Sequence, residues 1–185
     1  MTFISLRSVI LFSVLAACCV ACAWMFWPRP IVSLPRLSAA EISALGDSPA
    51  DRHALFVHLS AVLLGRGQQL GPWQQLPHEA QPVWTTLYVE TCIDGRDGLR
   101  SFLPPEPGVV VATTPSASPT LDDAATGYRA MGSNELADCL DRCARSLAAQ
   151  RRAPGDFAKQ YQPLIAAARA SRVAYQRQHV TALNP

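Results

Sequence analysis

Apolar residues follow two patterns along the 185-residue chain, a continuous run near its start and a spaced pattern after it. The run covers residues 8–27 and contains no charged side chain. After residue 50, apolar residues recur every three to four positions in several segments, which is typical of one face of an α-helix. The pattern predicts a mainly α fold: a small multi-helix domain that follows a single N-terminal hydrophobic helix.

Four segments carry the main helices of this expected domain. The first covers residues 50–69, and the second starts near His78 or Gln81 and continues through about Thr91. The third, residues 134–150, has the clearest apolar stripe, opposite a side with charges spaced i, i+4. The last includes Phe157 to Tyr175, and we expect it to break or restart at Pro163, because proline donates no backbone hydrogen bond.

Cap and turn residues mark two shorter helices between these segments. Ser38 is placed to cap a helix over residues 37–45. The sequence Thr120-Leu121-Asp122-Asp123 fits a capping box, and Gly132 is expected to close the helix that this box opens. Ser133 would then cap the helix that follows.

The uncharged run 8–27 is long enough to cross a bilayer. Twenty residues at about 1.5 Å rise cover about 30 Å, and tryptophans at the far end suit the headgroup interface. The favoured interpretation is an uncleaved signal anchor. The segment Leu15-Ala16-Ala17-Cys18 resembles a bacterial lipobox, so a lipoprotein carrying its lipid on Cys18 is an alternative, and an ordinary cleaved signal is a third.

These features predict that the chain has three parts and that the protein lies in a membrane. Residues 1–27 form the anchor or lipoprotein-type signal, residues 28–49 a proline-rich spacer with a short helix, and residues 50–185 the helical domain. We expect a single-pass protein of the bacterial inner membrane. The short basic N-terminus favours a periplasmic domain.

Charge is segregated along the chain although its formal total is only +2. Residues 28–141 hold 7 Arg against 13 acidic residues, a net of −6, whereas residues 142–185 hold 7 Arg and one Lys against one Asp, a net of +7. The two parts can attract each other, or the basic part can meet an anionic surface. A basic face of Arg151, Arg152, Lys159, Arg169, Arg172 and Arg177 is a candidate for phosphate or lipid headgroups, although a solvated helix face is the simpler interpretation.

One group of acidic residues adjoins a glycine turn. Glu90, Asp94 and Asp97 could bind a cation or act as acid and base, and Gly98 and Phe102 beside them could serve an interaction. Ordinary helix-end and turn chemistry explains the same residues more simply. The chain has no P-loop, dinucleotide fingerprint, HExxH motif or nucleophile elbow, so we expect no cofactor and no metal.

The histidines and cysteines suggest packing roles. Four His are scattered along the chain and are interpreted as surface or internally satisfied residues. Three Cys, at 92, 139 and 143, lie in the domain, and we expect buried free thiols, with a disulfide from Cys92 to one of the others as the alternative.

Part of the domain resembles the DNA-mimic-protein family of small bacterial helical domains. The resemblance rests on Tyr88-Val89-Glu90-Thr91, the glycine turn with Gly98-Leu99-Arg100-Ser101-Phe102-Leu103, residues 121–130, Gly132 and the helix from Asn134. It covers about residues 80–150 and implies a helical fold. The family's named activity requires an acidic surface, whereas this domain is nearly neutral and ends basic, so only the fold is carried over.

The combined pattern predicts a membrane-tethered, non-catalytic helical domain that acts through a protein partner. One alternative is a hydrolase or metal-dependent enzyme that uses Glu90, Asp94 and Asp97. Another is a domain that binds anionic lipid through its basic C-terminal face. A nucleic-acid partner is not expected, because no exposed aromatic residues are interleaved with the basic ones.

Overall fold

The computed structural model describes residues 35–64, 71–96, 98–103 and 118–185. The chain divides into two compact units, Met1–Val32 and Ser33–Pro185, and every described residue belongs to the second. The predicted N-terminal hydrophobic helix, Cys18 and Asp97 therefore lie outside the described residues. Within those residues no helix is long and apolar enough to span a membrane.

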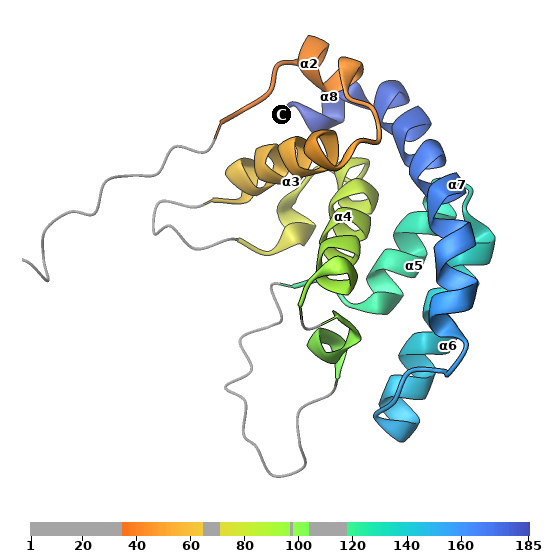
Figure 1. The fold of residues 1–185 in the computed structure, drawn as a ribbon. Helices are drawn as coiled ribbons and strands as arrows, with labels where there is room; N and C mark the ends of the chain where they lie inside the picture. The colour runs from red at the N-terminus through yellow and green to blue at the C-terminus, as the bar shows by residue number, and fades with distance from the viewer. Residues whose placement is uncertain (1–34, 65–70, 97, 104–117) are drawn as a thin grey trace, which may run out of the picture. The chain divides into compact units, whose positions relative to one another are not determined.

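The described residues form helices and no strands, which confirms the predicted mainly α class (Figure 1). The elements in chain order are α2 (Ala39–Ala44), α3 (Pro49–Leu63), the 3-10 helix η1 (Trp73–Gln75), α4 (Ala80–Asp94), the 3-10 helix η2 (Gly98–Phe102), α5 (Leu121–Ala130), α6 (Asn134–Gln150), α7 (Phe157–Gln178) and α8 (Val180–Leu183).

The predicted helix starts and stops are largely confirmed. Ser38 caps α2 in a capping box with Glu41, and Thr120 caps α5 in a capping box with Asp123. Gly132 follows α5 with a φ of +80°, a left-handed conformation that glycine adopts without steric cost. Ser133 stands at the N-cap of α6, but its side chain makes no capping hydrogen bond.

The predicted break at Pro163 is wrong, because α7 continues through this residue from Phe157 to Gln178. A proline inside a helix leaves the carbonyl four residues earlier without its usual donor. That carbonyl belongs to Lys159, and both Lys159 and Pro163 are exposed. Water can therefore satisfy the carbonyl, and the apolar face of α7 holds the helix together. The predicted helix over 50–69 ends earlier, at Leu63, and α4 extends three residues beyond Thr91.

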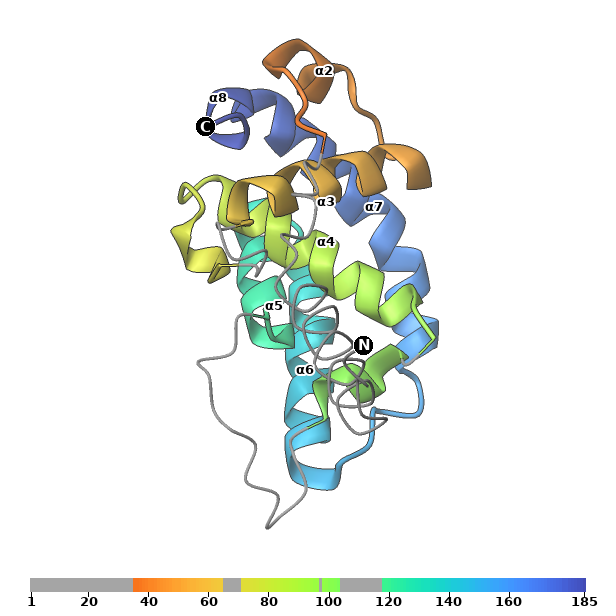
Figure 2. The ribbon, with the colours of Figure 1, turned by 90° about the vertical axis from the view of Figure 1, so that its left-hand side faces the viewer.

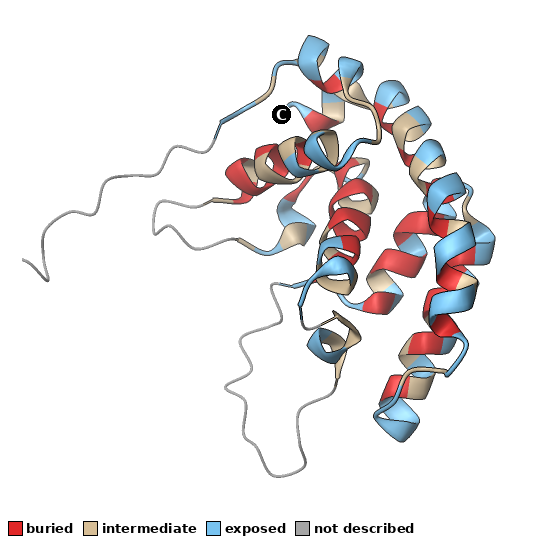
Figure 3. Cartoon of the chain, in the orientation of Figure 1, coloured by how far each residue is buried: buried red, intermediate tan, exposed pale blue. Residues whose placement is uncertain are grey.

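The helices enclose two hydrophobic clusters. The first involves α5, α6 and α7, and includes Tyr128, Leu140 and Ile165. The second involves α2, α3, α4 and α8, and includes Leu59 and Trp84. Helix α4 contacts α3 on one side and α5 on the other, so it connects the two clusters (Figures 1 and 2). In Figure 3 the buried residues form stripes along the helices, with exposed residues along their other faces.

His58 joins the beginning of the described domain to its C-terminal end. Its side chain is 1% exposed, its Nδ1 accepts the N–H of Leu37 at 2.8 Å, and its Nε2 lies 2.8 Å from the carbonyl oxygen of Leu183. Because Nδ1 accepts, Nε2 carries the proton and donates to Leu183. The prediction of an internally satisfied histidine is confirmed here.

The three described cysteines are free, as predicted. Cys139 and Cys143 lie on the buried face of α6, and Cys92 on α4 is half-buried. Burial raises the pKa of the Cys143 thiol to about 11. These thiols therefore act as small apolar side chains, and the alternative disulfide from Cys92 is absent from the structure.

Candidate functional site

Glu90 lies at the centre of a buried ionic cluster. Its carboxylate accepts the Tyr128 hydroxyl proton at 2.6 Å (O to O), the Arg169 Nε–H at 3.0 Å, and a short hydrogen bond from Arg172 Nη1. The Nε of Arg52 is a further 3.9 Å from Glu90 Oε2. Glu90 and Arg172 are 3% and 1% exposed. The residues of the cluster come from four elements, α3, α4, α5 and α7, which therefore meet at this pair.

Two further carboxylates complete the Glu90 cluster at its solvent side. Asp94 Oδ2 lies 3.4 Å from Arg169 Nη2, and Asp47 Oδ1 lies 3.5 Å from Arg172 Nη2. Arg52 Nη1 donates to the Asp47 carbonyl at 2.7 Å. The cluster thus contains three carboxylates and three guanidinium groups, and its formal charge is zero.

The cluster fixes Glu90 in its ionised form. Burial alone raises the pKa of the Glu90 carboxyl, but the charge of Arg172 and the hydrogen bonds from Tyr128 and Arg172, with the charge of Arg169, outweigh burial and lower it. Burial, followed by the negative charge of Glu90, raises the pKa of Tyr128 well above its ordinary value. An ionised carboxylate that already accepts three hydrogen bonds is poorly suited to act as a general acid or base.

The structure places two of the residues predicted around the glycine turn, Glu90 and Asp94, in the ionic cluster, and two others, Gly98 and Phe102, in η2. Glu90 points inward and Asp94 lies at the solvent edge of the cluster, where its side chain is 52% exposed. Gly98 begins η2 with a φ of +51°, and Phe102 at the end of η2 packs partly buried against the first hydrophobic cluster. Both residues therefore serve the turn and the core. Among the described residues, no three His, Cys, Asp or Glu side chains are placed to hold a metal ion.

The predicted basic C-terminal face is wrong as a single surface. Arg172 is buried and Arg169 is half-buried, and both pair with Glu90. The negative charge of the carboxylate compensates the cost of removing the two guanidinium groups from water. The other members, Arg151, Arg152, Lys159 and Arg177, are exposed. The segregated charge allowed two interpretations, attraction between the acidic and the basic part of the chain or binding of the basic part to an anionic surface. Arg169 and Arg172 agree with the first, because they pair with carboxylates of the acidic part.

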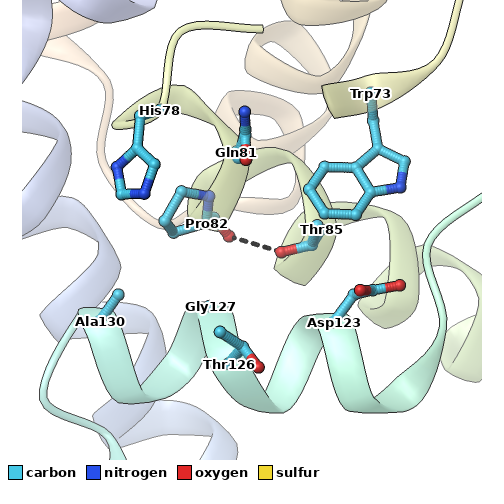
Figure 4. Close-up of a pocket in the computed structure, with 9 residues that line it drawn as sticks. All are labelled: Trp73, His78, Gln81, Pro82, Thr85, Asp123, Thr126, Gly127 and Ala130. Carbon is cyan, nitrogen blue, oxygen red and sulfur yellow. Dashed lines mark hydrogen bonds between the residues drawn. The ribbon is translucent and has the colours of Figure 1, made fainter. Parts of the chain in front are cut away.

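A groove lies between the N-terminal half of α4 and α5. Its volume is about 160 Å³, and Figure 4 shows the residues that line it, Trp73, His78, Gln81, Pro82, Thr85, Asp123, Thr126, Gly127 and Ala130. Trp73 and Asp123 stand at one end, from η1 and α5, and His78 stands at the other. The lining is mostly apolar, and Trp73 is held in place because it also packs against the second hydrophobic cluster.

Gly127 forms the part of the groove floor where the two helices approach most closely. A Cβ at this position would lie 2.8 Å from Thr85 Oγ1 and 3.0 Å from the Pro82 carbonyl oxygen, closer than real Cβ atoms come. Glycine is therefore required for this helix crossing. The resulting contact leaves the exposed Thr126 and Ala130 of α5 facing the groove (Figure 4).

Comparisons with family models, curated proteins and solved structures found no match for the chain.

Sequence reasoning missed the groove, the pairing of Glu90 with Arg169 and Arg172, and three further members of the cluster, Asp47, Arg52 and Tyr128. Trp73 belongs to no motif of the sequence, and Asp123 belongs only to a capping box. One signal was present: a glycine at position 127 inside a capped helix indicates a close helix crossing. The partners of Glu90 gave no local signal, because Arg169 and Arg172 are 79 and 82 residues away in sequence.

Proposed function

We propose that the protein is a membrane-tethered, non-catalytic domain that binds another protein through the groove between α4 and α5. The observation that carries the proposal is the groove itself: a mostly apolar depression open to solvent, with a half-buried tryptophan at its end. Sites with an aromatic anchor in an apolar depression are typical of protein recognition.

The Glu90 cluster supports the non-catalytic part of the proposal. The alternative enzyme needs Glu90 to move protons or hold a cation. In the structure this carboxylate is paired with Arg169 and Arg172 and is 3% exposed. These contacts favour a role in joining α4 to α7.

The tether in the proposal rests on sequence. Residues 8–27 are uncharged and long enough to cross a bilayer. We expect the full chain to stay in the membrane fraction after an alkaline wash, and a variant lacking residues 8–27 to be released. Release of the full chain by the wash would overturn the tether. If a palmitate analogue labels the protein and the label is lost in Cys18→Ser, the protein is a lipoprotein and not one with an uncleaved anchor. A reporter fused after Pro185 shows on which side of the membrane the domain lies.

Site-directed photocrosslinking in intact cells tests the binding site. A benzoylphenylalanine at Thr126, on the groove rim, should give a discrete protein adduct, whereas the same group at the exposed Ala166 of α7 should not. Filling the groove with Ala130→Trp should abolish the adduct from position 126. The same adduct from both positions, or an adduct that survives Ala130→Trp, would overturn the groove as the interaction site.

A further inference from the structure

We propose that the groove between α4 and α5 binds the guanidinium group of an arginine side chain on the partner protein. This inference rests on the proposed function and adds the chemistry that the partner must present. The evidence for it is the set of polar atoms in the groove that have no hydrogen-bond partner among the described residues.

The side-chain donors in the centre of the groove are already used. Gln81 Nε2 donates to two backbone carbonyls of the preceding segment, at 3.2 and 3.0 Å. Thr85 Oγ1 donates to the Pro82 carbonyl at 3.2 Å, and Thr126 Oγ1 donates to the Asp122 carbonyl at 3.0 Å. Of these side chains, Gln81 and Thr126 still offer oxygen lone pairs to a ligand, whereas Thr85 is only 1% exposed.

The end of the groove near Trp73 adds a negative charge and an aromatic ring. Asp123 uses Oδ2 for the capping box with Thr120, and its Oδ1 accepts no hydrogen bond within the described part of the chain. The Trp73 ring stands across from Asp123, and its indole nitrogen lies on the side of the ring turned away from Pro82 (Figure 4). A cation beside Asp123 would meet a carboxylate, and it would gain a cation–π contact if it stacked on the face of the Trp73 ring.

A guanidinium group matches this combination better than other ligands. It carries five N–H donors and no acceptor, and it is planar and stacks on aromatic rings. A cavity of about 150 Å³ holds a benzene molecule, so the groove's volume of about 160 Å³ takes a guanidinium and part of its stem. The methylenes of that stem would lie on Pro82, Gly127 and Ala130. Phosphate ligands are disfavoured, because Asp123 would repel them.

Titration of the intact chain in detergent micelles with blocked tripeptides tests the inference. The probes are acetyl-Gly-Arg-Gly-amide and the same peptide with citrulline, which has the shape of arginine without its charge, or with lysine. The readout is the indole N–H resonance that disappears in Trp73→Phe. The arginine peptide should shift this resonance saturably with a Kd in the millimolar range, about −4 kcal/mol of binding, and the citrulline peptide should not shift it.

Asp123→Asn has a matched control in Asp122→Asn, an equal charge change on the adjacent exposed residue, which does not line the groove. We expect about tenfold weaker binding of the arginine peptide to Asp123→Asn and unchanged binding to Asp122→Asn. Equal weakening in both variants, equal binding of the citrulline peptide, or tighter binding of the lysine peptide would overturn the inference. A crosslink from position 126 that survives Asp123→Asn would leave the proposed function standing while this inference fails.

Discussion

Glu90→Gln is the substitution that tests the buried ionic cluster most directly. The change keeps the size of the side chain and removes the charge that Arg169 and Arg172 share. Arg172 is 1% exposed and would keep only the more distant Asp47 carboxylate at 3.5 Å. Removing one partner of a buried pair typically costs about 3–5 kcal/mol, because it leaves the other charge uncompensated. The Asp47 contact and the hydrogen-bonding capacity of Gln favour the lower end, about 3 kcal/mol.

Thermal unfolding of the intact chain in detergent micelles, followed by circular dichroism at 222 nm, measures this effect. For a domain of this size about 1 kcal/mol shifts Tm by roughly 2–4 °C, so Glu90→Gln should lower Tm by about 6–12 °C. Asp94→Asn is the control, since its 3.4 Å pair with Arg169 is half-exposed and is expected to contribute at most about 1 kcal/mol. The combined change Glu90→Leu, Arg172→Met and Tyr128→Phe should recover part of the loss, because neither a buried charge at that pair nor the Tyr128 hydroxyl is then left without a partner. If Glu90→Gln lowers Tm no more than Asp94→Asn does, the cluster does not hold the helices together as argued.

The same pair of proteins gives a pH signature. The pKa of Glu90 is lower in the folded state than its ordinary value of about 4.3, so its contribution is fully present above that value. The contribution is lost as pH falls through the lower folded pKa. The Tm difference between the wild-type protein and Glu90→Gln should therefore be constant from pH 7 to 5 and shrink below about pH 4. A difference that stays constant down to pH 3 would contradict the assignment of a paired, ionised Glu90.

Three further outcomes follow from single positions. Gly127→Ala should cost about 1–3 kcal/mol in thermal unfolding, because the added Cβ meets the facing helix, while Gly155→Ala, which has open space, should be neutral or slightly stabilising. His58→Ala should cost about 2 kcal/mol and speed hydrogen exchange at the Leu37 amide and at the amides of α8, since the Leu37 N–H and the Leu183 carbonyl lose their partner; unchanged exchange at either place would contradict that link. Cys143 should react with maleimide at pH 7.5 far more slowly than the half-buried Cys92 until the protein is unfolded, because burial raises its pKa to about 11.

The parts of the fold that were predicted correctly depend on local chemistry. The capping boxes at Ser38 and Thr120 and the positive φ at Gly132 each involve residues within a few positions of one another. The helix over residues 134–150 was predicted from its own apolar stripe and has the same bounds in α6. Pro163 was misjudged because the local cost of a proline was weighed without the burial of Phe157, Tyr161 and Ile165 on the other side of α7.

The candidate site was less predictable because its parts meet only in the folded domain. Arg169 and Arg172 occupy positions that are polar in the sequence pattern, and polarity alone does not distinguish a solvated arginine from one paired with a distant carboxylate. Glu90 was selected for its proximity to a glycine turn, whereas its chemistry is determined by α5 and α7. Trp73 and Asp123 belong to different elements, and their shared groove depends on the close crossing at Gly127.

The bond pattern at His58 closes the described domain on itself. The side chain connects Leu37, near the start of the described residues, with Leu183, near their end. With its amide nitrogen oriented toward the Leu37 carbonyl, Asn184 adds two more bonds of 3.3 Å to the same segment, one to that carbonyl and one from the Ala39 N–H. Leu37 and the C-terminal residues of the described domain are therefore held to the same side chain of α3, and a change that loosens one of them is expected to loosen the other.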